Sequence, residues 1–237
     1  MFYDIHCHLT SDCFASTIIE LNNKLKKNKI VAFSNGINYE DNLKNLELNN
    51  KFSNIKPCLG MFPLESFDKR VLNQFKNKRI VGVGEVGLDF SSNIDESQVS
   101  NLKKIARVCE ELNLPMIVHS RSAEKRVVEL IKNFKTNVIL HYFCGKKGLI
   151  KQALEQDNVF FSISASSVYD EHVKGLIKEV PISKLLCETD SPCLWKYCIN
   201  TPLNVVRAYE TISEIKNLEL KNVEKLIEKN VKKVFRL

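Results

Sequence analysis

The amino-acid sequence predicts an α/β fold with parallel strands, a TIM-type (β/α)8 barrel. Eight short apolar or β-branched runs recur about every 26 residues, the length of a strand, a helix and two loops. Helix-like stretches lie between them, and no Gly-, Ser- or Pro-rich linker interrupts the chain. Five runs end in histidine or acidic side chains that are costly to bury, as expected of barrel strands that carry an active site. A doubly wound open sheet would show the same alternation and is the alternative.

The elements follow from hydrophobic periodicity. The expected strands are Phe2–His6, Ile30–Ser34, Ile55–Met61, Ile80–Glu85, Met116–His119, Val138–His141, Val159–Ser162 and Leu185–Glu188. Apolar residues at helical spacing predict helices over Ser97–Leu112, Ala123–Phe134, Lys146–Gln156, Leu203–Lys216 and Leu220–Phe235. We expect residues 1–237 to form one domain, because the apolar segments are evenly spread.

Composition limits the class of protein. Hydrophobic residues make up 44% of the 237, enough for a sizeable core. The net charge of +7 favours a polyanionic partner, but a lysine-rich coding bias explains it equally well. The amino terminus lacks the pattern of a secretion signal and no apolar run spans a bilayer, so we expect a cytoplasmic protein without membrane association. Its eight cysteines are then expected to be reduced and mostly structural.

Histidines are concentrated where predicted strands end. His6 and His8 are two residues apart on the first strand, so their side chains point to the same side, which Asp4 shares. An H-x-H pair alone is as typical of buried structural histidines as of a metal site. However, His119 and His141 also end strands, whereas His172 lies in a polar stretch that favours a solvated helix.

Two acidic residues complete this set. Glu85 ends a strand with no other polar side chain, so it is expected to bridge metal ions or to cap the next helix. Asp190 follows the eighth strand. Four histidines and two acids suffice for two divalent ions that share a carboxylate, and burying all six unpaired would cost several kcal/mol. We therefore favour a metal centre over structural burial.

Five motifs in order resemble the TatD family of metal-dependent deoxyribonucleases in the amidohydrolase superfamily. They are D-x-H-C-H-L at the amino terminus, G-E-V-G-L-D at 84–89, P-x-x-x-H-S-R at 115–121, H-x-F-x-G at 141–145 and E-T-D-S-P at 188–192. The resemblance covers nearly the whole chain, including Asn200, Pro202 and Asn230. It implies a barrel in which His6, His8 and Asp190 hold one ion, His119 and His141 hold a second, and Glu85 bridges them.

The same resemblance implies cleavage of phosphodiester bonds by metal-activated hydroxide, as a 3′–5′ exonuclease on single-stranded DNA, with no obligate protein partner. The imidazole-rich ligand set suits Zn²⁺, Mn²⁺ or Ni²⁺, and the carboxylates also admit Mg²⁺. Three positions depart from the family pattern: Thr10 replaces an acid, Phe62 replaces a histidine that contacts the substrate phosphate, and Tyr142 and Cys144 alter H-C-F-S-G.

Individual roles follow from chemistry. Asp190 is expected to act as a metal ligand and general base, with Glu85 as the second catalytic carboxylate. Arg121 is placed to bind a phosphate, or else to form a surface ion pair. Glu188 either orients a ligand histidine or forms a strand-end salt bridge. Phe62 favours two alternatives, hydrolysis of an ester or amide, or deacylation of aminoacyl-tRNA. A nucleic-acid-binding protein without catalysis is the third hypothesis, and the six intact ligands argue against it.

Overall fold

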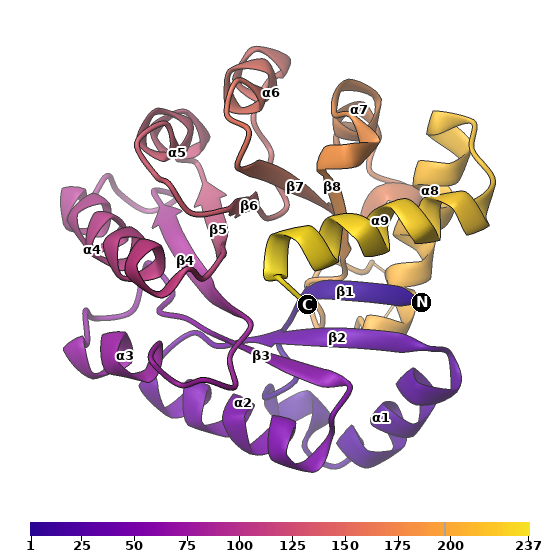
Figure 1. Cartoon of the computed structure of the whole chain (residues 1–237), viewed down its shortest axis with the longest axis horizontal. Coiled ribbons are helices and arrows are strands. Elements are labelled where there is room, and N and C mark those ends of the chain that lie inside the picture. Colours follow the sequence, from indigo (N-terminus) through magenta and orange to yellow (C-terminus); the bar gives the residue numbers. More distant parts are fainter. Residues whose placement is uncertain (197) are drawn as a thin grey trace.

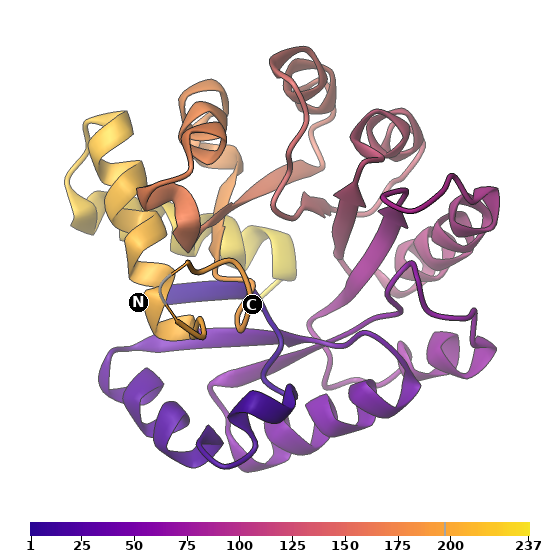
Figure 2. The ribbon, with the colours of Figure 1, turned by 180° about the vertical axis from the view of Figure 1, so that it is seen from behind.

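The computed structural model describes residues 1–196 and 198–237 and confirms the barrel. Within those residues, eight parallel strands form one sheet in the order β1 to β8, so each strand pairs with its successor in sequence. Helices alternate with the strands and surround them (Figures 1 and 2). The strands are β1 Phe2–Cys7, β2 Ile30–Asn35, β3 Ile55–Leu59, β4 Gly82–Asp89, β5 Met116–Arg121, β6 Val138–Leu140, β7 Val159–Ser164 and β8 Leu185–Glu188.

The helices cover the outside of the sheet and its amino-terminal end. Their apolar stripes face the strands, and the cores of α4, α5 and α9 are almost entirely Val, Leu, Ile, Ala, Cys and Phe. Their bounds are α1 Ile18–Lys27, α2 Tyr39–Lys51, α3 Lys69–Gln74, α4 Glu96–Leu112, α5 Glu124–Ile131, α6 Lys147–Leu154, α7 Glu171–Glu179, α8 Val205–Lys216 and α9 Leu220–Phe235.

The seam between β1 and β8 closes the barrel at its carboxyl end. The backbone N–H of Asp190 donates to His6 O at 2.9 Å, and that of His8 donates to Ser191 O at 2.7 Å. The two donors, Asp190 and His8, follow β8 and β1. Cys7 and Ser191 also form an isolated parallel bridge. The first and last strands are therefore joined at three of the predicted metal ligands, His6, His8 and Asp190.

Helix α9 closes the opposite end of the barrel. It packs against β1 and β8 and crosses the front of Figure 1. The Asn230 side-chain amide donates to Leu185 O at 2.8 Å, at the start of β8, and the Phe235 ring lies 4.6 Å from the Phe33 ring. The strand carboxyl ends remain open on the other side, where barrel enzymes place their catalytic residues.

Five strands continue beyond the residues at which we expected them to end, and β4 continues the furthest. The prediction that the fourth strand ends at Glu85 is wrong, because β4 runs on to Asp89 and pairs with β5 as far as Arg121. The register of β4 against β5 shifts between Val83 and Val86, and that of β1 against β2 shifts between Asp4 and Cys7. Such irregularities turn a side chain to a new direction. Here they lie at Glu85 and His6.

Gly87 permits β4 and β5 to approach closely at this point. Its φ is +150°, and a Cβ atom there would lie 2.1 Å from the carbonyl oxygen of His119. Any larger residue would separate the two strands that carry Glu85 and His119. The glycine therefore fixes the spacing of two predicted ligands.

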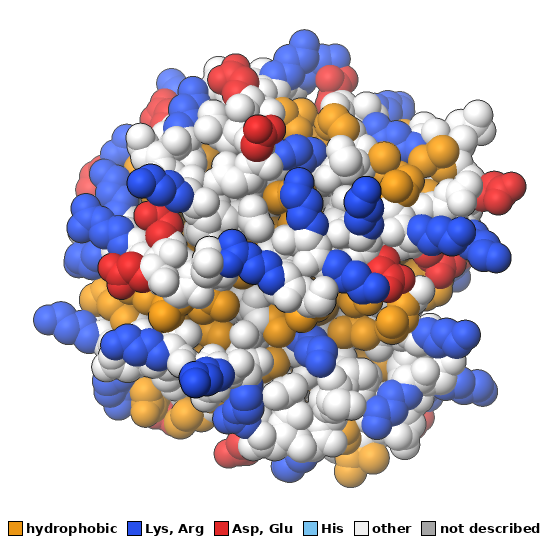
Figure 3. Space-filling model, viewed as in Figure 1, with side chains coloured by type: hydrophobic (Ala, Val, Ile, Leu, Met, Phe, Trp, Pro, Cys, Tyr) orange, Lys and Arg blue, Asp and Glu red, His pale blue; other side chains and the backbone are white. Residues whose placement is uncertain are grey.

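The basic side chains are dispersed on the face shown in Figure 3, which is the face that α9 crosses. Lysines and arginines there alternate with acidic and apolar groups and form no single cluster. No helix in the described residues is long and apolar enough to span a membrane. All eight cysteines are free thiols, four of them buried: Cys7, Cys58, Cys109 and Cys187.

Candidate metal centre

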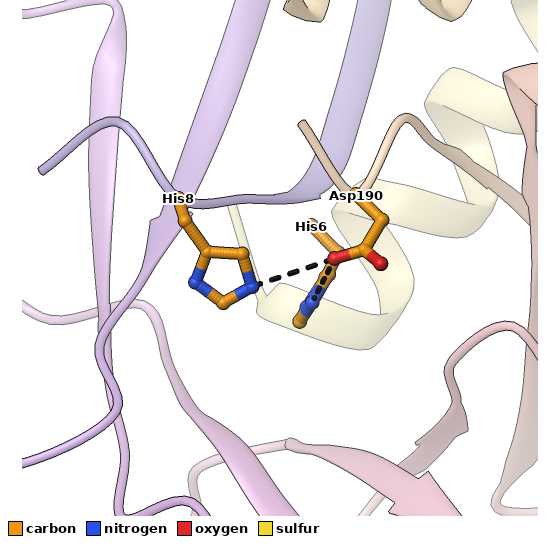
Figure 4. Close-up of side chains that lie close together, drawn as sticks. All are labelled: His6, His8 and Asp190. Carbon is orange, nitrogen blue, oxygen red and sulfur yellow. Dashed lines mark ion pairs between the residues drawn. The ribbon is translucent and has the colours of Figure 1, made fainter. Parts of the chain in front are cut away.

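Six polar side chains from five strands converge at the carboxyl end of the barrel. The Nε2 atoms of His6 and His8 lie 3.3 Å and 3.4 Å from Oδ1 of Asp190 (Figure 4). These three residues offer ligand atoms within 4.8 Å of one another, and so do His6, Glu85 and His141. Segments far apart in sequence thus bring together two groups of potential metal ligands.

Glu85 lies between two pairs of histidines, and each of its oxygens faces a different pair. Oε2 is 3.3 Å from His8 Nε2 and 3.6 Å from His6 Nε2. Oε1 is 2.8 Å from His119 Nδ1 and 3.5 Å from His141 Nε2. A carboxylate with this orientation has the geometry needed to bridge two cations. It comes from a strand that continues past it, so the helix-capping alternative does not describe its position.

The donor set fits a cation. Both ring nitrogens of His6 are buried and, among the described residues, have no hydrogen-bond partner. Buried polar atoms are almost always satisfied, so an unpartnered imidazole facing two carboxylates is typical of a ligand site. Nitrogen and carboxylate oxygen are ligands that divalent transition metals accept.

Both acids of this cluster remain ionised. Burial alone would raise the pKa of Asp190 and Glu85, but the surrounding histidines outweigh it and hold the pKa of each carboxyl below its usual range. Burial lowers the pKa of His141, yet the Glu188 carboxylate beside it raises that pKa to about 9. The site therefore holds negative charge that protons or metal ions must balance.

Three of the four histidines have a second partner behind the ring. Glu188 is fully buried and lies 3.1 Å from Nδ1 of His141, while its other oxygen accepts a bond from the Tyr142 N–H at 3.0 Å. Nδ1 of His8 lies 3.1 Å from the carbonyl oxygen of Asn35. These contacts fix the direction of each ring, as supporting groups do in metal sites.

Asp89 supports His119 and was missed by the sequence reasoning. Its Oδ2 lies 3.1 Å from Nε2 of His119, and the residue is 2% exposed. The signal was present, since Asp89 is four residues after Glu85 and belongs to the G-E-V-G-L-D motif. It was overlooked because the strand was expected to stop at Glu85.

Asp4, which shares the parity of His6 and His8, does not join the cluster. Its carboxylate accepts bonds from the backbone N–H and the hydroxyl of Thr189, at 3.0 Å and 2.6 Å. The register shift after Asp4 explains why equal parity does not give equal direction. His172 also lies outside the cluster, exposed on α7.

A cavity of about 400 Å³ opens beside the cluster. His119, His141 and Asp190 line it together with Arg121, which is exposed at the end of β5, and Tyr142. The ring of Phe62 lies outside this lining set and packs edge-on against His119, with 5.0 Å between ring centroids. The cavity thus has the Arg121 guanidinium and the Tyr142 ring in its wall, next to the ligand cluster.

Comparisons with known proteins identify the family. The family model for TatD related DNase matches residues 3–236. The chain belongs to the TatD family. An uncharacterised metal-dependent hydrolase of Methanocaldococcus jannaschii is 32% identical over 99% of this chain and 97% of its own length. Deoxyribonuclease TATDN3 of Homo sapiens is 29% identical, over 98% of this chain and 93% of its own.

Solved structures agree on the fold. The TatD homologue YjjV from Escherichia coli superposes with a TM-score of 0.89 at 20% identity and covers 100% of this chain and 98% of its own. At that identity the likeness establishes the barrel and its connectivity. The family resemblance expected from the five motifs is confirmed by the family model and the sequence relatives of this TatD protein.

Proposed function

We propose that this TatD protein is a metal-dependent deoxyribonuclease that cleaves phosphodiester bonds, as a 3′–5′ exonuclease on single-stranded DNA. One observation carries the proposal: the two oxygens of Glu85 face separate histidine pairs in a chain whose family model is that of a DNase. Residues 1–237 act as one hydrolase domain in this proposal.

Two divalent ions, Zn²⁺, Mn²⁺, Ni²⁺ or Mg²⁺, are the proposed cofactors. His6, His8 and Asp190 would hold the first ion, His119 and His141 the second, and Glu85 would bridge them. Bound ions of this kind acidify water and polarise the ester phosphate. His6 also lies within reach of the second group, since its ring stacks on that of His141 at 3.9 Å.

The protein's own residues would position substrate and move the proton. Oδ1 of Asp190 faces the two histidines, and its other oxygen points away from both rings (Figure 4). That second oxygen is available to accept a proton from the attacking water, as a general base must. Arg121 lines the cavity and would bind a phosphate oxygen with its guanidinium. Glu188 would hold His141 in its ligand orientation.

The test is cleavage of 3′-labelled single-stranded DNA in the presence of Mn²⁺. We expect stepwise shortening from the 3′ end that chelation abolishes, with a double-stranded oligonucleotide cut more slowly. The matched control is Glu85→Gln, which keeps the shape of the side chain but removes its charge, and should be inactive. Intact DNA under all metals would refute the proposal.

Phe62 supports a second candidate, hydrolysis of another ester or amide, including aminoacyl-tRNA. Its ring packs on His119 where the family pattern has a histidine that contacts phosphate, so one phosphate contact is replaced by an apolar edge. A panel of carboxylic esters, amides and aminoacyl-tRNA, assayed beside the DNA, separates the candidates. Rapid ester turnover without DNA cleavage would favour the second.

A further inference from the structure

We propose that Asp89 is a positioning residue that fixes the tautomer of His119 and thereby makes its Nδ1 atom a metal ligand. This inference rests on the proposed metal centre and concerns one of its four histidines. The ring of His119 lies between two carboxylates, with Nδ1 2.8 Å from Glu85 Oε1 and Nε2 3.1 Å from Asp89 Oδ2. Only one of its nitrogens therefore faces the ligand cluster.

Asp89 is held rigidly by groups that have no contact with the metal cluster. Its Oδ1 accepts bonds from the backbone N–H and the hydroxyl of Ser91, at 2.9 Å and 2.5 Å. The Gln98 amide pairs with the backbone of Asp89, since its oxygen accepts from the N–H at 2.8 Å and its nitrogen donates to the carbonyl at 3.1 Å. These bonds leave Oδ2 directed at the histidine.

The chemistry of the pair determines which nitrogen carries the proton. Oδ1 of Asp89 already accepts two bonds from Ser91, and a carboxylate has no proton to give, so its Oδ2 accepts from Nε2 of His119. A neutral imidazole that donates from Nε2 keeps its lone pair on Nδ1. That lone pair points toward Glu85 and the proposed second ion.

The second ion's site then differs from the first in its supporting groups. Both of its histidines have a carboxylate behind them, Asp89 for His119 and Glu188 for His141. In the first site, His8 is supported by a backbone carbonyl and His6 by no hydrogen-bond partner among the described residues. Carboxylates raise the basicity of a ligand imidazole more than a carbonyl does. Asp89 therefore affects the binding of the second ion and not that of the first.

The test compares Asp89→Asn with Asp89→Ala. In Asp89→Asn, the side-chain oxygen still accepts from Ser91, so the amide NH₂ faces His119 and forces Nε2 to accept. The proton then moves to Nδ1 and blocks the ligand position. In Asp89→Ala no group dictates the tautomer. We expect Asp89→Asn to lower the affinity for the second ion by about 10- to 100-fold. The loss should be larger than in Asp89→Ala.

The readouts are metal content, Co²⁺ titration followed by absorption, and the ¹⁵N shifts of His119, none of which needs a substrate. The control variant is Glu96→Gln, an exposed residue at the start of α4 that pairs with Arg126 and should change nothing. A structural role for Asp89 would give the reverse order, because Asn preserves the Ser91 contacts and Ala does not. That order, unchanged binding in Asp89→Asn, or a wild type that binds a single ion would each overturn the proposal.

These outcomes are distinct from a failure of the proposed nuclease activity. A protein that binds two ions with the expected dependence on Asp89, yet leaves DNA intact, supports the inference and refutes the substrate. If the Asp89→Asn variant cuts DNA as well as the unaltered protein and binds both ions unchanged, the substrate is supported and the inference is refuted.

Discussion

Asp4 of β1 accepts two hydrogen bonds from Thr189, one from its backbone N–H at 3.0 Å and one from its hydroxyl at 2.6 Å. Both residues are fully buried, and they join the first strand to the segment after the last one. The oxygen of this hydroxyl also lies 3.0 Å from the Ser191 hydroxyl, from which it can accept. Because Asp190 follows Thr189 directly, this pair holds Asp190, a proposed metal ligand, against His6 and His8.

Thr189→Val should therefore destabilise the fold. The substitution keeps the shape of the side chain but leaves a buried carboxylate oxygen without its donor, which costs about 1–3 kcal/mol. Urea denaturation of the metal-free protein measures this. Thr189→Ser retains a hydroxyl and should lose less. Thr201→Val is the matched control, since that residue is half-buried and its backbone N–H, not its hydroxyl, donates to the Asn200 side chain. Equal stability of all three proteins would contradict the role given to Asp4.

Asp190→Asn should abolish most of the activity. The amide cannot accept the proton of the attacking water, and losing a general base costs about 10²- to 10⁴-fold in kcat. Metal content must be measured on the same sample, because Asp190 is also a proposed ligand. Asp12→Asn, an exposed residue near the same rim, serves as control. Nearly full activity with metal bound would exclude Asp190 as the base.

Metal removal should lower both activity and stability. The cluster brings two carboxylates held in ionised form next to buried imidazoles, so a bound cation stabilises the folded state only. At a free ion concentration 100 times the Kd, binding raises the free energy of unfolding by about 2.7 kcal/mol. Thermal melts with chelator, then with added Mn²⁺ or Zn²⁺, follow the change. Identical melting temperatures in both conditions would show that no ion binds to the folded chain.

Arg121→Ala should weaken binding of DNA rather than slow its cleavage. The guanidinium is exposed at the mouth of the cavity, where it would neutralise one phosphate. Removing one such contact should raise KM and reduce the slope of log affinity against log salt by about 0.7 for a single strand. Arg236→Ala, beyond the end of α9, is the comparison. A salt slope that is the same in both variants would exclude a phosphate contact at Arg121.

Thiol reactivity should divide the cysteines into two equal groups. Cys13, Cys144, Cys193 and Cys198 are exposed, whereas the other four are buried. Burial raises the pKa of the Cys58 and Cys109 thiols, which suppresses the reactive thiolate further. Titration with a disulfide reagent should therefore count four thiols in the folded protein and eight in urea. Eight fast-reacting thiols without urea would contradict the buried positions.

The barrel was predictable because its sequence signals are local and repeated. Each strand is a short apolar run, and amphipathic stretches such as Ser97–Leu112 have a helical period, so the order of the eight strands and five of the nine α-helices in the described residues follow from the chain alone. The polar residues at strand ends also indicated which rim carries the site. Closure was less evident, because the β1–β8 seam depends on backbone bonds of His8 and Asp190 that no period reveals.

Side-chain direction was the part that the sequence did not determine. The parity rule grouped Asp4 with His6 and His8, but the register shift in β1 directs Asp4 to Thr189 instead. Similarly, the shift at Glu85 allows β4 to continue to Asp89 while Glu85 faces inward. Such irregularities arise from tertiary contacts, so a regular period of two cannot anticipate them.

The position of α9 has a consequence for synthesis of the chain. Residues 220–235 cover the amino ends of β1 and β8, and Phe235 packs on Phe33 of the second strand. The first strands of the barrel are thus covered by a helix that comes after all eight strands in the sequence. A nascent chain would expose the apolar ends of β1 and β2 until residue 235 has emerged, so we expect closure of this barrel to wait for α9.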